Sequence, residues 1–381
     1  MKFVNVLFVV LLYCTHLSAQ VTLPNNLYFT HIGVEDGLCQ NTVCCILQDH
    51  LGFIWLGTKD GLTRYDGYRF RVFKHDAADP MSIGNNFIRV LYEDADGLIW
   101  IGTNVGVYIY NPETENFRKF DVATERGDVI SREVSSIKCD SSGDLWIGVN
   151  WQGVFRYDRR DESLELYEPV PGDTTSLSSV HVWDLCFDGD GNLWVGSQNG
   201  GLDRYDRETD RFVRHRLKGL SDVSRIVLDK QNQLLLGTMK DGLFSFNPYM
   251  GTCQPLLLDS GHKDLFVRAI FVRNSREVVV GTENGIYIYD CVTRKTRHVN
   301  QELGNPYSLS CKAVYSIYCD KEGALWIGTY FGGVNYLPPS SSLIFDKFYP
   351  IGHSDRLSGK AVREFVRDES GIIWILSLIH I

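Results

Sequence analysis

Several polar segments of this sequence combine aromatic and amide side chains. The aromatic residues are Trp151, Tyr330 and Phe331, and the amides are Asn150, Gln152, Gln198 and Asn199. An aromatic ring offers a flat apolar face, and an amide offers both a donor and an acceptor. This combination suits a sugar ring, which has apolar C–H faces and equatorial hydroxyl groups. We therefore expect a carbohydrate site centred on Trp151 and Tyr330, with Lys59 and Lys240 available for an acidic sugar.

The same aromatic residues support a second interpretation. Exposed aromatic side chains are also typical of protein interfaces. Trp151, Tyr330 and Phe331 could therefore pack on a second domain or on another subunit, and the residues alone leave both interpretations open.

One acidic segment resembles the start of a calcium-binding loop. It is "DGDGN" at 188–192, with alternating oxygen ligands and a glycine. If Asp188 is the first position, the twelfth is Asn199, where a calcium loop needs a glutamate. The corresponding segments at 229–232 and 273–276 lack the oxygens. We expect these aspartates to cap hairpin turns, and we expect no metal and no cofactor.

Motifs of catalysis are missing from the sequence. It contains no GxSxG, HExxH or P-loop motif, and its ten histidines are scattered. A binding module is therefore favoured, with a protein-interaction scaffold and a glycan hydrolase or lyase as the alternatives. Assays of binding and cleavage on one panel of glycans would separate the three.

The charge balance argues against nucleic acid as a partner. Lys and Arg total 38 and Asp and Glu total 47, so the net charge is −9. Nucleic-acid binding requires a basic face that neutralises phosphates. We therefore expect no nucleic-acid binding by this chain.

The elements that carry these side chains are repeats. The segment "GLIWIGT" at 97–103 has close copies at 52–58, 143–149, 191–197 and 323–329, and weaker copies at 232–238 and 276–282. The glycine that closes each copy recurs every 41 to 48 residues. Each unit contains runs of alternating hydrophobicity separated by Asp- and Gly-containing turns, which predicts four short strands. Four-stranded sheets that stack radially bury both their faces, so the sequence predicts an all-β, seven-bladed β-propeller over 20–342.

This architecture assigns positions to the repeated residues. The tryptophans at 55, 100, 146, 194 and 326 should pack between blades, with Leu235 and Val279 in their place in the fifth and sixth units. The glycine two residues later should allow close backbone approach. By analogy with other propellers, 26–32 should pair beside 332–337 and close the ring. The turns after the tryptophan strands should then share one face, with Trp151 and Tyr330 opposite each other across its mouth.

The repeats resemble a known family. The pattern "DxxGxLWIGTxxGGLxRYD", the opening segment 28–70 and the segments 173–182 and 305–314 are similar to the two-component regulator propeller repeat. The resemblance covers about 27 to 375. It implies the periplasmic, oligosaccharide-sensing region of a hybrid two-component sensor kinase. Full members resemble two propellers followed by an immunoglobulin-like spacer, an inner-membrane helix, a histidine kinase, a receiver and a DNA-binding module, and they are expected to form homodimers.

Both ends of the chain carry further expectations. Residues 1–19 read as a secretory signal peptide, with an apolar run and a small-residue cleavage site. Near the other end, 361–375 begins an eighth unit that continues as "LSLIHI" instead of Gly-Thr. We expect 343–381 to be the start of a second propeller in a truncated fragment, with 343–351 as its first strand. The ten cysteines contain no CxxC pair, so we expect buried thiols and not disulfides or a zinc site.

Overall fold

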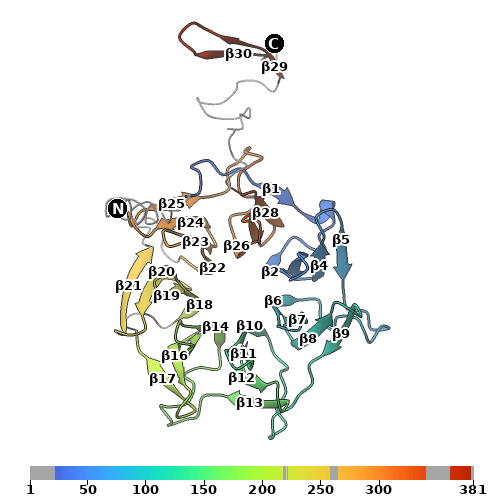
Figure 1. Cartoon of the computed structure of the whole chain (residues 1–381), viewed down its shortest axis with the longest axis vertical. Coiled ribbons are helices and arrows are strands. Elements are labelled where there is room, and N and C mark those ends of the chain that lie inside the picture. Colours follow the sequence, from blue (N-terminus) through green and yellow to red (C-terminus); the bar gives the residue numbers. More distant parts are fainter. Residues whose placement is uncertain (1–21, 218–219, 221, 258–264, 340–360, 379–381) are drawn as a thin grey trace, which may run out of the picture.

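Seven four-stranded antiparallel sheets form a closed ring (Figure 1). This computed structural model describes residues 22–217, 220, 222–257, 265–339 and 361–378. The first strands of neighbouring sheets contact one another around the axis, and each later strand lies farther out. The predicted seven-bladed β-propeller is therefore confirmed.

Each blade holds four strands, which follow one another from the axis outward. Blade 1 holds β2 (Val43–Gln48), β3 (Ile54–Thr58), β4 (Gly61–Tyr65) and β5 (Phe70–Phe73), and blade 2 holds β6 (Ile88–Glu93), β7 (Ile99–Thr103), β8 (Gly106–Asn111) and β9 (Asn116–Lys119). Blade 3 holds β10 (Val134–Cys139), β11 (Leu145–Val149), β12 (Gly153–Asp158) and β13 (Ser163–Tyr167), and blade 4 holds β14 (Val182–Phe187), β15 (Leu193–Ser197), β16 (Gly201–Asp206) and β17 (Arg211–His215). Blade 5 holds β18 (Val223–Leu228), β19 (Leu234–Thr238), β20 (Leu243–Asn247) and β21 (Thr252–Leu257), and blade 6 holds β22 (Val267–Val272), β23 (Glu277–Thr282), β24 (Gly285–Asp290) and β25 (Thr296–Val299). Blade 7 holds β26 (Val314–Cys319), β27 (Leu325–Thr329), β28 (Val334–Leu337) and β1 (Thr30–Ile32).

Blade 7 closes the ring with a strand from the other end of the chain. β1 pairs antiparallel with β28, with His31 opposite Asn335, and the short 3-10 helix η1 (Val34–Asp36) follows it. Within the predicted segments 26–32 and 332–337, the pairing is confirmed for 30–32 with 334–336. This pairing ties the first blade to the last, so both ends of the sheet array are covered.

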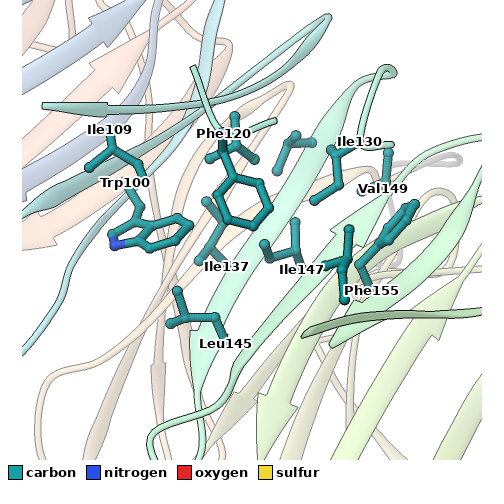
Figure 2. Close-up of a cluster of buried hydrophobic side chains, with 12 residues drawn as sticks. Trp100, Ile109, Phe120, Ile130, Ile137, Leu145, Ile147, Val149 and Phe155 are labelled. Carbon is teal, nitrogen blue, oxygen red and sulfur yellow. The ribbon is translucent and has the colours of Figure 1, made fainter. Parts of the chain in front are cut away.

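The repeated tryptophans pack between blades. In Figure 2, Trp100 of blade 2 lies beside Ile137 and Leu145 of blade 3. All five tryptophans are buried, and so are Leu235 and Val279 in blades 5 and 6. The prediction that these residues form the core between blades is confirmed.

The glycine of each motif is a second contact point between blades. A Cβ on Gly102 would lie 2.5 Å from a methyl carbon of Val90 in its own blade and 2.6 Å from one of Val134 in the next. A Cβ on Gly57 would likewise lie 2.7 Å from a methyl carbon of Ile88 in the next blade. Any side chain at these positions would push neighbouring blades apart, which explains why each unit carries glycine there.

An aspartate six residues before each tryptophan holds the first turn of the blade. One carboxylate oxygen of Asp188 accepts the backbone N–H groups of Asp190 and Asn192, and the other accepts the indole N–H of Trp194 at 2.8 Å. The same Asp–Trp bond, 2.7–3.2 Å long, joins Asp49 to Trp55, Asp94 to Trp100, Asp140 to Trp146 and Asp320 to Trp326. These aspartates are turn caps, as predicted, and they also satisfy a buried indole.

A separate hairpin is formed by β29 (Ala361–Arg367) and β30 (Ile373–Leu378). It repeats the first two strands of a blade, including a 2.9 Å bond from Trp374 to Asp368. The signal peptide expected at 1–19 and the strand expected at 343–351 fall outside the described residues. In the part of the chain that the structure describes, no helix is long and apolar enough to cross a membrane.

Candidate ligand-binding face

Every residue that the sequence analysis predicted to bind a ligand lies on one face of the ring. We call it the upper face: it is the end of each blade where the second strand passes to the third. Because all blades run in the same order, these connections emerge together. They comprise 59–60, 104–105, 150–152, 198–200, 239–242, 283–284 and 330–333. On the lower face, the first strand of each blade turns into the second.

Four residues gather where blades 7 and 1 meet on this face, and we call them the seam cluster. Lys59, Tyr330 and Phe331 belong to the predicted set, and Tyr315 joins them. The Lys59 ammonium lies 3.0 Å from the Tyr330 hydroxyl and 4.2 Å from its ring centroid. Tyr330 stacks on Tyr315, with centroids 5.1 Å apart, and meets the Phe331 ring edge-on at 4.2 Å. Phe331 is 69% exposed, so the seam cluster offers an aromatic face to solvent.

A second group, the Trp151 cluster, lies where blades 3 and 4 meet. Trp151 is 66% exposed and meets His181 edge-on, with ring centroids 4.0 Å apart. The His181 ring also contacts the side-chain oxygen of Asn150 at 3.2 Å, and its backbone carbonyl accepts the N–H of Gln198. Trp151 has a φ of +70°, a conformation that L-residues seldom adopt. Its backbone N–H donates to Val180, and this bond holds the indole on the upper face.

The remaining predicted residues also lie on the upper face, but they have different surroundings. Gln152 uses both ends of its amide within the fold, because it accepts from Ser131 and Arg132 and donates to Val129. Asn199, at φ +60°, borders a separate cavity of about 370 Å³ in blade 4. Lys240 is exposed in blade 5. No ring contact or hydrogen bond between described residues joins the seam cluster to the Trp151 cluster.

The structure adds a set of side chains that the sequence analysis missed. In every blade, the pairing of the first two strands skips one residue near the upper end of the first strand. Such a bulge redirects the extra side chain. The seven skipped residues, which we call the bulge ring, are Cys44, Arg89, Ser135, Trp183, Ser224, Arg268 and Tyr315. A sequence signal existed, because a constant Val or Ile precedes this variable position in every unit.

Cationic groups converge at the bulge ring. The Arg89 guanidinium lies 4.1 Å from the Phe87 ring centroid and 3.1 Å from a Glu133 oxygen. Arg268 lies 4.5 Å from the Tyr315 ring centroid and pairs with Glu283 at 2.5 Å. Tyr315 therefore connects the bulge ring to the seam cluster.

Among the described residues, one cation in this region lacks a carboxylate partner, and one buried donor lacks an acceptor. Lys59 has no carboxylate within 4 Å among the described residues. The buried indole nitrogen of Trp183 likewise has no hydrogen-bond acceptor there. A buried donor without an acceptor is costly and rare in proteins, so a ligand or ordered water would be expected to satisfy it.

The Cys44 thiol is one member of the bulge ring. Burial raises the pKa of the Cys44 thiol to about 11, although Arg89, Lys59 and Arg268 act in the opposite direction. Cys44 is therefore a neutral thiol at physiological pH. All nine described cysteines are free; Cys186 is buried as expected, whereas the other eight are only half-buried. Among the described residues, no three His, Cys, Asp or Glu side chains are grouped to hold a metal.

Comparisons with known proteins agree with the architecture. A family profile described as "Two component regulator propeller" matches residues 37–60, 82–105, 176–199 and 308–331. A 59-residue segment is 39% identical to Histidine kinase P4 of Formosa agariphila, covering 16% of this chain and 4% of that protein. The extracellular domain of the hybrid two-component system BT3049 of B. thetaiotaomicron superimposes with a TM-score of 0.77 and 28% identity, over 92% of this chain and 47% of that one. This chain thus spans about half of that domain.

An enzyme shares the fold at lower identity. The virginiamycin B lyase of Staphylococcus aureus superimposes with a TM-score of 0.62 and 13% identity, covering 82% of this chain and 99% of the lyase. Likeness at that level extends to the fold alone, because one fold supports unrelated activities.

Proposed function

The chain belongs to the two-component regulator propeller repeat family, and on that premise we propose that it is the oligosaccharide-binding part of an extracytoplasmic sensor. The finding that carries the proposal is the composition of the upper face. Exposed aromatic rings lie there beside amides and beside a lysine that has no carboxylate partner among the described residues. Aromatic faces bind the C–H faces of sugars, and an unpaired cation favours a carboxylate or sulfate on the sugar.

We place the principal contacts at the seam cluster. Tyr315, Tyr330 and Phe331 supply the aromatic surface, and Lys59 supplies the charge. Arg89 and Arg268 extend the positive region toward the axis, while Glu133 and Glu283 balance part of their charge. The Trp151 cluster would bind a more distant residue of the oligosaccharide.

We further propose that the chain acts within a longer protein. In that protein, the propeller would lie in the periplasm, beside a second propeller, and would pass its signal to a membrane-linked histidine kinase in a homodimer. The support is its likeness to part of an extracellular domain of a hybrid two-component system. In that protein, the exposed aromatic side chains would also be able to pack against the second propeller. This packing is the main alternative role of the upper face.

Calorimetry with matched acidic and neutral oligosaccharides tests the proposal. The acidic series should bind, and Tyr330→Ala should weaken binding by about tenfold or more, as expected for an anchoring aromatic residue. Trp151→Ala should weaken binding of longer oligosaccharides more than that of disaccharides. Tyr249→Ala removes an exposed tyrosine from a lower-face turn and is the matched control. Unchanged affinity in both upper-face variants would exclude this site, and release of cleaved glycan would identify the chain as an enzyme.

A further inference from the structure

A cavity of about 730 Å³ opens on the lower face, where blades 7 and 1 meet. Its lining combines aromatic and acidic side chains. The aromatic residues include Tyr65, Trp326 and Tyr336, and the acidic ones include Asp66, Asp320 and Glu322. This cavity lies on the opposite face from the seam cluster, and nothing in the proposed glycan site uses it.

Two of the other six junctions between blades contain an arginine at the equivalent position, and the other four do not. Arg159 follows the last residue of β12 in blade 3 and reaches back to the first turn of blade 2. There it lies 3.3 Å from Asp94 and also pairs with Asp96. Arg207 follows β16 in blade 4 and reaches the first turn of blade 3, 2.9 Å from Asp140. In these two junctions, the later blade inserts a guanidinium group into the acidic turn of the earlier blade.

The junction of blades 7 and 1 has the acidic turn but lacks the arginine. Asp320 and Glu322 occupy the positions of Asp94 and Asp96. The residue after Asp66, where the arginine would stand, is Gly67 at φ +98°. Among the described residues, no lysine or arginine nitrogen lies within 4 Å of either carboxylate. The neighbouring Lys321 points its ammonium elsewhere, donating to the backbone carbonyl of Asp49 at 2.7 Å.

The vacant position retains the features that bind a guanidinium group. Asp320 accepts the indole N–H of Trp326, just as Asp94 accepts that of Trp100 while also pairing with Arg159. Asp320 can therefore accept a further hydrogen bond from a guanidinium group while it still caps the turn. The Tyr65 and Trp326 rings, 6.0 Å apart between centroids, line the cavity beside Asp320, and the Tyr65 ring also stacks on Phe70. A planar guanidinium can bridge two carboxylates and stack on an aromatic ring, whereas an ammonium is a more strongly hydrated point charge.

We propose that this cavity binds the arginine side chain of another polypeptide, between Asp320, Glu322 and the aromatic wall. The arginine would take the place that Arg159 and Arg207 fill from within the chain in other blades. The volume leaves room for the residues that flank it. The lower face would thus recognise an arginine-bearing protein segment, independently of the glycan bound above.

Calorimetry with short capped peptides tests this proposal on the full chain. The probe is acetyl-Gly-Arg-Gly-amide, and the comparison is acetyl-Gly-Lys-Gly-amide. The arginine peptide should bind several-fold more tightly. Glu322→Gln should weaken its binding by about tenfold, because one charge-assisted contact is lost. Glu322 is exposed and is not the residue that caps the turn, so this variant should fold normally.

The matched control is Asp96→Asn, which alters the corresponding residue where Arg159 already fills the junction. It should leave peptide binding unchanged. Absence of binding at millimolar arginine peptide would overturn the proposal, and so would equal affinity for the lysine peptide. An Asp96→Asn effect as large as that of Glu322→Gln would also overturn it, because the peptide would then be binding to acidic turns in general.

Discussion

Lys59 and Tyr330 join the first and last blades on the upper face: the ammonium lies 3.0 Å from the phenolic oxygen and over the aromatic ring. The two residues are 271 positions apart in the sequence. They meet only because β1 and β28 close the ring. A ligand on the seam cluster would therefore contact two blades that are not consecutive in the chain.

The charge of Lys59 should determine which sugars bind. Lys59→Met keeps most of the side-chain volume but removes the cation. We expect this variant to lose the preference for acidic over neutral oligosaccharides, because the neutral contacts of Tyr330 and Phe331 remain. Binding of the acidic series should also become less sensitive to salt, since fewer charges are screened. Calorimetry at two ionic strengths measures both effects, and an unchanged salt dependence would argue against a contact between Lys59 and the ligand.

The Asp–Trp bond should be a major contribution to the stability of each blade. Asp188→Ala removes the acceptor of the buried Trp194 indole and of two backbone N–H groups. We expect a loss of about 2–4 kcal/mol in the free energy of unfolding, because buried donors are left unsatisfied. Urea denaturation monitored by fluorescence measures this loss of stability. Asp190→Ala in the same turn is the control and should change stability by less than about 0.5 kcal/mol.

Asp203 should make stability depend on pH. Burial raises its pKa from 3.8 to about 6, although Ser178 donates two hydrogen bonds to the carboxylate. The folded state therefore holds this proton more tightly than the unfolded state. The stability that Asp203 contributes is full below about pH 4 and is lost as pH rises through about 6, by an amount on the order of 2–3 kcal/mol.

Asn335 occupies the same position in blade 7. Its amide oxygen accepts the Ser310 N–H, as the Asp203 carboxylate accepts that of Ser178, and its amide NH₂ donates to the Ser310 hydroxyl. We therefore expect Asp203→Asn to match the parent near pH 4 and to exceed its stability above pH 6. The reciprocal change, Asn335→Asp, should lower stability above pH 6. Urea denaturation at pH 4.5 and 7.5 measures the stability of the parent and of both variants. A stability difference between the parent and Asp203→Asn that does not vary with pH would disprove this explanation.

Closure of the ring should depend on Phe29. This residue is fully buried with Leu309 and Val279, and its N–H donates to Tyr307 at 2.9 Å. Phe29→Ala should cost about 3–5 kcal/mol, since it leaves a cavity beside β1. Val34→Ala, at an exposed position of η1, is the control. Proteolysis of the segment before β1 should become faster in Phe29→Ala and remain unchanged in Val34→Ala.

The repeat, the strands and the face on which the variable connections lie could all be predicted from the sequence. Alternation along a strand and Asp–Gly turns are local signals, and the copies of the motif reinforce one another. The burial of Trp55 and its equivalents followed from that pattern, and the pairing of β1 with β28 followed from analogy with other propellers. The repeat also made the aspartate turns interpretable as caps, although it did not reveal their bond to the indole.

Which side chains meet could be learned only from the folded ring. The bulge in each first strand redirects Arg89, Trp183 and Arg268, and a two-residue alternation cannot predict a bulge. Ring closure places Lys59 against Tyr330, and it places Gly67 opposite the acidic turn at Asp320. In both cases the residues are more than 250 positions apart, so their arrangement depends on the geometry of all seven blades, which no local stretch of sequence encodes.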